Sequence, residues 1–354
     1  MKSWGLSFLI VFKKRHHSRF KPAFTIVELL VVIVVIGVLA AITTVSYTGI
    51  AKKATVASLI SDLNNSSKLL KMDQVTNMSY PTTLAAANGG KGIPTSPGVT
   101  YDYIVNNSTN PPGFCITATK NQVTYKITEN SNPTQGNCID YGLVLSLDSS
   151  SPASYPGTGT SIYDLTNLNT NITSYDPNVI ISNSAFDFTA SNTDGLSVQN
   201  NNFSNLKDFT MECVFNLNGA HLHYDGALIS SGDWNNSHWS LGINQTNTAV
   251  KTRKPYTTTA YAFSLNSWYH IYFTRSSTKL TIFINGSKII EYTSNDSIPL
   301  VSGWNNTAVG RETYANGYFN LNGKISVVKI YNRALSIDEM TQNFNTLRNR
   351  YGIL

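Results

Sequence analysis

Residues 268–292 read WYHIYFTRSSTKLTIFINGSKIIEY, three apolar-rich runs separated by short polar stretches. The last two runs are joined by Asn285 and Gly286, residue types that tolerate the positive φ angles of a two-residue hairpin turn. Apolar residues that alternate on both sides of such a turn predict antiparallel strands with one buried face. The stretch therefore predicts a β-hairpin within an all-β domain.

The same pattern continues on both sides of this hairpin. Residues 209–217 (FTMECVFNL) carry apolar side chains at alternate positions, so we expect Cys213 to point into a core as a small apolar group. Residues 324–331 (KISVVKIY) read as another strand. Ser336 and Glu339 then have the spacing of a capping box, which opens a short helix. An all-β sandwich that ends in a short C-terminal helix is therefore expected.

These stretches resemble the laminin-G-like, concanavalin A-like family. In that family a Trp-x-His strand is followed by a Leu-x-Ile-Phe-x-Asn-Gly hairpin, and a Gly-Lys-Ile strand by Ile-Tyr-Asn-Arg-Ala-Leu-Ser. The matching residues are 268–270, 280–286, 323–325 and 330–336. The resemblance covers residues 140–354 and implies a jelly-roll sandwich. The family includes lectins, calcium-dependent adhesins and inert spacers, so the fold leaves the ligand open.

The resemblance also indicates where a calcium site would lie, because those family members that bind Ca²⁺ use carboxylates and carbonyls on one rim. Asp164 and Asp194 are the candidate oxygen donors. Since Ca²⁺ takes about six to eight oxygen ligands, the alternative is that both aspartates only cap turns. Ca²⁺ is therefore a possible cofactor, and the sequence makes no cofactor certain.

A loop-like stretch in this domain has the composition of a carbohydrate site. Such sites combine flat aromatic faces with amide and carboxylate groups. The candidate residues are Asp233, Trp234, Asn235, Asn236 and Trp239. The alternative is that the tryptophans belong to the sandwich core.

No motif for catalysis accompanies the fold. Related jelly-roll glucanases carry Glu-x-Asp-x-Glu on one strand, a spacing that turns the carboxylates to one face of the sheet. This triplet is absent here, and so are Gly-x-Ser-x-Gly and His-Glu-x-x-His. We therefore expect a binding or structural protein and not an enzyme.

The N-terminal part of the chain carries a membrane segment. Residues 24–42 read FTIVELLVVIVVIGVLAAI, with Glu28 as the single charge. As a helix this run would be roughly 28 Å long, close to the hydrocarbon thickness of a bilayer. Only basic charges precede it, which predicts a cytoplasmic N-terminus and an extracytoplasmic remainder. A carboxylate within the hydrocarbon is costly, so Glu28 is expected to have a partner.

Residues 21–30 (KPAFTIVELL) resemble the prepilin processing site of type IV pilins and type II secretion pseudopilins. In that family a peptidase cuts before the Phe and the new amine is N-methylated. The Glu five residues into the mature chain is thought to pair with the amine of a neighbouring subunit. The resemblance implies cleavage between Ala23 and Phe24, a leader of residues 1–23, and an assembly role for Glu28. The family usually has Gly where this chain has Ala23.

A secretory signal peptide and an ordinary anchor are the alternatives for this segment. The signal peptide is disfavoured because the helical pattern continues past the apolar run, and an ordinary anchor does not explain Glu28. Further apolar residues recur at helical spacing: Val56, Leu59, Ile60, Leu63 and Leu70. We therefore expect one helix over residues 24–72, transmembrane over 24–42, whose later part packs on a globular head.

Residues 73–139 are expected to form this small β head. They are rich in Pro, Gly, Asn and Thr, with strand-like runs at 99–105, 114–118 and 122–127. Disulfides persist outside the cytoplasm, so Cys115 and Cys138 are expected to form one.

The charge distribution argues against nucleic acid as a partner. The net charge is +6 and the pI is about 9.0, but the basic excess lies in the leader. The balanced remainder offers no stripe that would follow a phosphate backbone.

Together these features predict an α+β protein with a long N-terminal helix, a small β head and a jelly-roll sandwich. The two resemblances imply a type IV pilin-like subunit of the inner (cytoplasmic) membrane, cut by prepilin peptidase. It would assemble with like or unlike pilin subunits in a pilus or pseudopilus at the cell surface. Its lectin-like domain would serve adhesion to carbohydrates or surface proteins. The alternatives are a pseudopilin of a secretion or DNA-uptake machine, whose β domain binds other subunits, and a surface-tethered glycan hydrolase.

Overall fold

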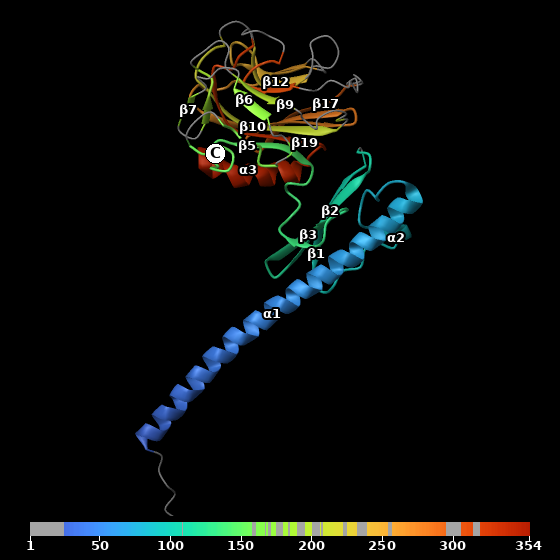
Figure 1. Ribbon diagram of the computed structural model, residues 1–354, viewed down its shortest axis with the longest axis vertical. Helices are drawn as coiled ribbons and strands as arrows, with labels where there is room; N and C mark the ends of the chain where they lie inside the picture. Colours follow the sequence, from blue (N-terminus) through green and yellow to red (C-terminus); the bar gives the residue numbers. More distant parts are fainter. Residues whose placement is uncertain are drawn as a thin grey trace, which may run out of the picture. The chain divides into compact units, whose positions relative to one another are not determined.

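The computed structural model describes most of the chain (Figure 1). The described residues are 25–107, 109–157, 161–166, 168, 171–174, 180–182, 185–189, 195–199, 206, 208–221, 225–231, 239–253, 257–294, 306–313 and 319–354. The chain divides into two compact units, Met1–Ala57 and Ser58–Leu354.

The described part of the first unit is the beginning of a long helix, α1 (Ile26–Asn77). An 18-residue window of α1 is apolar enough to cross a membrane, and none of that window is buried within the protein. Its large side chains face outward, as Ile26 (85% exposed) and Leu39 (57% exposed) illustrate. An apolar surface of this extent needs lipid or protein around it.

In the second unit, the later part of α1 forms the support of the small head. Leu59, Leu63 and Leu70 have no exposed surface and belong to one apolar cluster with Phe114 and Ile116 of the head sheet. The predicted amphipathic face is therefore confirmed. The helix itself runs beyond its expected end at residue 72 to Asn77.

The strands of the head pair antiparallel in the order β1-β2-β3-β4 among the described residues. The head elements are α2 (Ala87–Gly90), β1 (Thr100–Asn106), β2 (Gly113–Lys120), β3 (Val123–Thr128) and β4 (Thr134–Gln135). The first three strands confirm the predicted runs with small shifts at their ends. β4 is two residues long, too short to produce an alternating pattern, and was not predicted.

The rest of the second unit is the predicted sandwich of two antiparallel sheets. The first, sheet I, has the order β17-β16-β15-β10-β19-β8-β7 in the described residues, and β5 also pairs with β19. Its strands are β5 (Leu143–Asp148), β7 (Ile180–Ser182), β8 (Ala185–Asp187), β10 (Phe209–Leu217), β15 (Trp268–Ser276), β16 (Lys279–Ile284), β17 (Ser287–Thr293) and β19 (Gly323–Tyr331).

The second sheet, sheet II, has the order β14-β13-β12-β11-β18-β9-β6 in the described residues. Its strands are β6 (Asn171–Ser174), β9 (Leu196–Gln199), β11 (Gly226–Ser231), β12 (Trp239–Ile243), β13 (Ala249–Arg253), β14 (Thr257–Ala260) and β18 (Asn306–Val309).

The main core lies between the two sheets. β10 turns Met211, Cys213 and Phe215 into it, each with no exposed surface, so the free Cys213 is the small core residue that alternation predicted. The predicted hairpin turn is also confirmed. Asn285 and Gly286 join β16 to β17 with φ angles of 46° and 76°.

The C-terminal helix α3 (Ile337–Tyr351) covers the outer face of sheet I (Figure 1). The predicted capping box opens it: Glu339 N donates to Ser336 Oγ at 3.2 Å, and Ser336 N donates to Glu339 Oε2 at 2.9 Å. Met340 packs with Tyr272 and Tyr331 of the sheet in a second apolar cluster. Both faces of the central strands are therefore buried.

Glu212 of β10 lies beneath α3 with no exposed surface. Its Oε1 is 2.9 Å from His270 Nε2 and 3.7 Å from Lys329 Nζ. Its Oε2 accepts hydrogen bonds from the Tyr331 hydroxyl and the Asn343 amide, each at 3.3 Å. Burial alone would raise the pKa of Glu212, but the charge of Lys329 and the hydrogen bond from His270 outweigh it and hold the pKa at about 2. The carboxylate thus joins α3 to three strands.

Candidate functional site

The start of α1 holds the single charge of the apolar segment. Thr25 N and Thr25 Oγ1 donate to Glu28 Oε2 at 2.9 and 2.8 Å, and Glu28 N donates to Thr25 Oγ1 at 3.2 Å. This reciprocal pair is a capping box, which satisfies amides of the first helical turn. Glu28 Oε1 accepts no hydrogen bond from the described residues, so one carboxylate oxygen is open to a partner from outside.

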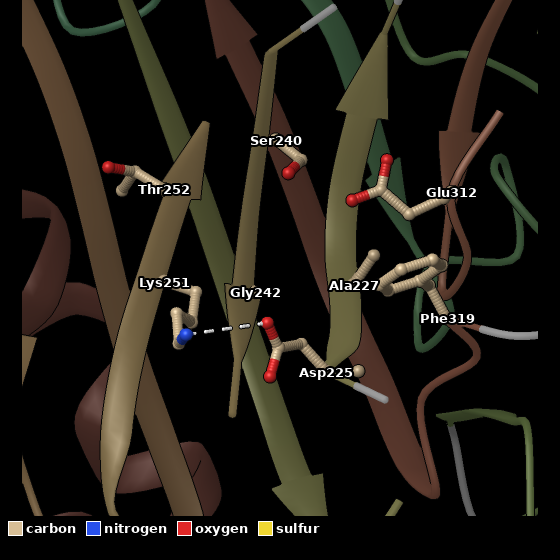
Figure 2. A pocket seen from close by; sticks show the side chains of 9 residues that line it. Asp225, Ala227, Ser240, Gly242, Lys251, Thr252, Glu312 and Phe319 are labelled. Atoms are coloured by element: carbon tan, nitrogen blue, oxygen red, sulfur yellow. Dashed lines mark ion pairs between the residues drawn. The ribbon is translucent and has the colours of Figure 1, made fainter. Parts of the chain in front are cut away.

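The outer face of sheet II carries a small polar hollow (Figure 2). Ala227, Gly242 and Lys251 are direct cross-strand neighbours on β11, β12 and β13, and such neighbours point to the same face of a sheet. Position 242 requires glycine, because a Cβ at this position would lie 2.7 Å from the carbonyl oxygen of Gly226. The floor of the hollow is thus made of small residues.

Polar and aromatic groups surround this floor (Figure 2). On one side, Lys251 Nζ lies 3.7 Å from Asp225 Oδ2, with both side chains partly exposed. On the other side Ser240 and Glu312 point toward one another, and only 5% and 3% of their surfaces are exposed. Phe319 stands at the edge. The cavity volume is about 10 Å³, the room of one water molecule or one hydroxyl group.

Known families match both ends of the chain. Residues 19–44 match the prokaryotic N-terminal methylation motif. Residues 190–341 match the concanavalin A-like lectin/glucanases superfamily. The two matches support the predicted combination of an N-terminal methylation motif with a concanavalin A-like domain. The concanavalin A-like domain extends beyond the matched residues, since β5 pairs with β19 and α3 ends at Tyr351.

Solved structures that are similar to part of this chain include two toxin domains. The binding domain of botulinum neurotoxin serotype D is 17% identical, with a TM-score of 0.46 over 59% of this chain and 53% of that chain. The binding domain of serotype C1 is 16% identical, with a TM-score of 0.44 over 59% of this chain and 53% of that chain. This chain therefore spans about half the length of these structures. No curated protein matches it.

Trp239 does not offer a face to a sugar. It begins β12 with no exposed surface, and its ring stacks on Phe209 at 5.6 Å between centroids. The alternative reading, that this tryptophan belongs to the sandwich core, is the correct one for Trp239. The other candidates of that stretch, Asp233, Trp234, Asn235 and Asn236, lie outside the described residues.

Asp164 occupies a buried turn of the concanavalin A-like domain, with 3% of its surface exposed. Its Oδ1 accepts hydrogen bonds from Ser146 N at 2.8 Å and Thr166 N at 3.1 Å, and its Oδ2 accepts one from the Thr166 hydroxyl. These are the bonds of a turn-capping aspartate. Asp194 lies outside the described residues, as do Ala23 and Phe24. Within the described part of the chain, no three His, Cys, Asp or Glu side chains gather as a metal-binding group, and the calcium site stays a prediction.

The head contains the predicted disulfide, Cys115–Cys138. Each cysteine has 1% of its surface exposed. Cys115 lies on β2, and Cys138 follows β4 and donates its backbone amide to Thr117 Oγ1 at 3.0 Å. The bridge therefore fastens the end of the head to its central strand.

Removing this bridge should destabilise the head by about 3 kcal/mol, the loop-closure estimate for a disulfide of this span. In the Cys115→Ala/Cys138→Ala variant, amide hydrogen exchange of β2 and β3 should accelerate accordingly. Adding dithiothreitol to this variant should change nothing further, because Cys213 is free and buried. Equal exchange rates in parent and variant would show that the bridge does not stabilise the head.

Proposed function

We propose that the protein is a type IV pilin-like subunit that enters the cytoplasmic membrane through α1 and displays its concanavalin A-like domain for adhesion from a pilus or pseudopilus. The observation that supports this proposal is the combination of two features in one chain. The apolar window of α1 has no buried part within the protein, and the C-terminal domain is a lectin-fold sandwich. Lipid, and later the helices of other subunits, would cover this window.

Assembly would use the free oxygen of Glu28. After cleavage by prepilin peptidase between Ala23 and Phe24, the N-methylated amine of one subunit would approach Glu28 Oε1 of its neighbour. An unpaired charge in hydrocarbon is costly, whereas a paired one is tolerated. The pair would therefore favour one register between neighbouring helices over all others.

The concanavalin A-like domain would act outside the membrane by binding and not by catalysis. Only basic charges precede α1, which supports a cytoplasmic N-terminus and an extracytoplasmic C-terminal domain. A domain of this size on every subunit would crowd a filament, which favours a minor or tip position. Its ligand class would be a carbohydrate or a surface protein.

The cleavage site can be tested through Ala23. We expect a mature chain that starts at methylated Phe24 when the full protein is coexpressed with a prepilin peptidase and its intact mass is measured. Ala23→Gly should be cut at least as fast as the parent in a pulse-chase experiment, because Gly is the usual residue before the cut. Ala23→Leu, with a bulky side chain, should be cut at least tenfold more slowly, on the order of 1.4 kcal/mol in barrier. Slower cutting of Ala23→Gly, or an N-terminus other than Phe24, would contradict the proposal.

A further inference from the structure

We propose that the chain forms an amide bond between two of its own side chains, from Lys329 Nζ on β19 to Asn343 Cγ on α3, with Glu212 of β10 as the catalytic residue. The bond would join α3 covalently to the sheet that it covers. It would lie within the concanavalin A-like domain and would form whatever that domain binds. The supporting observation is that one buried carboxylate contacts both an amine and a side-chain amide.

The strand register places the amine beside the carboxylate. Lys329 and Glu212 are direct cross-strand partners, so their side chains leave the same face of sheet I. Lys329 Nζ lies 3.7 Å from Glu212 Oε1, and 21% of the Lys329 side chain is exposed. Tyr331, two residues further along β19, points to this face as well, because its hydroxyl donates to Glu212 Oε2 at 3.3 Å.

Asn343 brings an amide to the same carboxylate from α3. Its Nδ2 donates to Glu212 Oε2 at 3.3 Å and to the Tyr331 hydroxyl oxygen at 3.1 Å. Only 2% of Asn343 is exposed, and its Oδ1 has no hydrogen-bond partner among the described residues. Lys329 is therefore a neighbour of both residues that hold the amide, one across the ladder and one along its own strand. The flexible four-carbon stem of a lysine allows its amine to approach the amide carbon from this position.

The reaction needs no reagent from outside the chain. Glu212 Oε1 accepts one proton from the Lys329 ammonium, which leaves a neutral and nucleophilic amine. Nζ attacks Asn343 Cγ and forms the new C–N bond. The Cγ–Nδ2 bond then breaks, and Nδ2 leaves as ammonia after taking one proton from the attacking nitrogen. Ammonia takes the proton held by Glu212 and departs as ammonium, which restores the carboxylate.

The charges of the buried pair set the speed of this reaction. Burial alone would raise the pKa of Glu212, but the charge of Lys329, followed by the hydrogen bond from His270, lowers it to about 2. A proton that moves from Lys329 to Glu212 removes both charges at once, and burial favours a neutral pair over two charges. The ionised pair still predominates, as that low pKa requires. The amide should therefore form slowly and accumulate as the folded protein ages.

The test is peptide mapping by mass spectrometry of the full chain in detergent, fresh and after one month in mildly alkaline buffer. The linked chain should be lighter by the mass of one ammonia. Trypsin does not cut after an acylated lysine, so the peptide of residues 325–333 should remain uncut at Lys329. We expect it to be joined to the peptide of residues 334–348, which contains Asn343, and this branched peptide should be abundant in the aged parent.

Three variants test the roles of the side chains. Lys329→Arg keeps a positive charge beside Glu212 but lacks the nucleophilic amine, so the branched peptide should be absent. Glu212→Gln keeps the shape of the side chain but removes the base, and it should also stop the reaction. The matched control is Asn345→Ala, which removes an exposed asparagine of the same helix and should give as much branched peptide as the parent. Near-UV circular dichroism establishes that each variant is folded.

The outcomes are distinct from those that test the proposed function. Absence of the branched peptide from the aged parent would overturn the inference, and α3 would then be held by noncovalent contacts alone. A linkage from Lys329 to a residue other than Asn343 would also overturn it. An equal amount of branched peptide in Glu212→Gln would contradict the catalytic role of Glu212. Failure of the proposed function is read independently, as absence of the processed chain from purified filaments.

Discussion

Replacing Glu212 with alanine is expected to lower the free energy of unfolding of the sandwich by about 3–5 kcal/mol. The carboxylate is fully buried and is the common partner of His270, Lys329, Tyr331 and Asn343. Without it, Lys329 loses its ion-pair partner, and the His270 side chain loses its only hydrogen bond among the described residues, since Nδ1 has none. Removing one partner of a buried ion pair leaves the other charge buried and uncompensated. This lowers the free energy of unfolding by more than the intact pair adds to it.

The same network should make stability depend on pH in the acid range. Glu212 has its pKa lowered from 4.5 to about 2 in the folded protein. A group with a depressed folded pKa stabilises the fold above its unfolded pKa, and this stabilisation disappears as the pH falls through the folded pKa. The stability difference between the parent and Glu212→Gln should therefore be constant above about pH 5 and shrink as the pH falls toward about 2.

Urea unfolding of the full chain in detergent, followed by tryptophan fluorescence, measures both effects, because Trp239 and Trp268 lie in the sandwich. The matched control is Glu291→Ala, which removes the carboxylate of an exposed ion pair with Lys279 on the same sheet. Exposed pairs contribute little, so the control should unfold like the parent. If Glu212→Ala also unfolds like the parent, α3 is not held by this carboxylate.

Local rules explain which elements the sequence could predict. The hairpin at Asn285 depends on two adjacent residues, and the start of α3 depends on Ser336 and Glu339, three positions apart. The amphipathic part of α1 and the alternation in β10 repeat at the period of one element. Such signals need no knowledge of what packs on the element, and the structure confirms each of them.

Glu212 and the hollow depend on distant contacts, which explains why the sequence did not reveal them. Alternation along β10 assigns Glu212 to the solvent side, and only α3, which is far along the chain, buries it. Lys251, Glu312 and Asp225 line one hollow only because β11, β13 and the segment after β18 assemble on one face. Trp239 misled the prediction for a related reason. Polar neighbours in sequence suggested a loop, while the strand register buries its ring.

Replacing Glu28 with alanine is expected to abolish incorporation into filaments while leaving processing and membrane insertion intact. The substitution removes the one charge from the apolar segment of residues 24–42, so insertion becomes easier. The neighbouring N-methylated amine then loses its partner in the hydrocarbon, and an unpaired buried charge costs about 3–5 kcal/mol. Even the lower value weakens the contact between the variant and its neighbours by about two orders of magnitude, so the variant is excluded from the filament. Purified filaments from cells that express the variant, probed for the C-terminal domain, measure incorporation.

Two further variants separate charge pairing from helix capping. Thr25→Ala removes the hydroxyl that caps Glu28 N and donates to Glu28 Oε2, but it keeps the carboxylate. It should lower helix stability by about 1 kcal/mol and still assemble. Glu28→Gln keeps the shape and most of the capping interaction but removes the charge, so it should fail like Glu28→Ala. Normal incorporation of Glu28→Gln would show that the cap and not the charge is required, because a neutral amide cannot compensate an ammonium group in hydrocarbon.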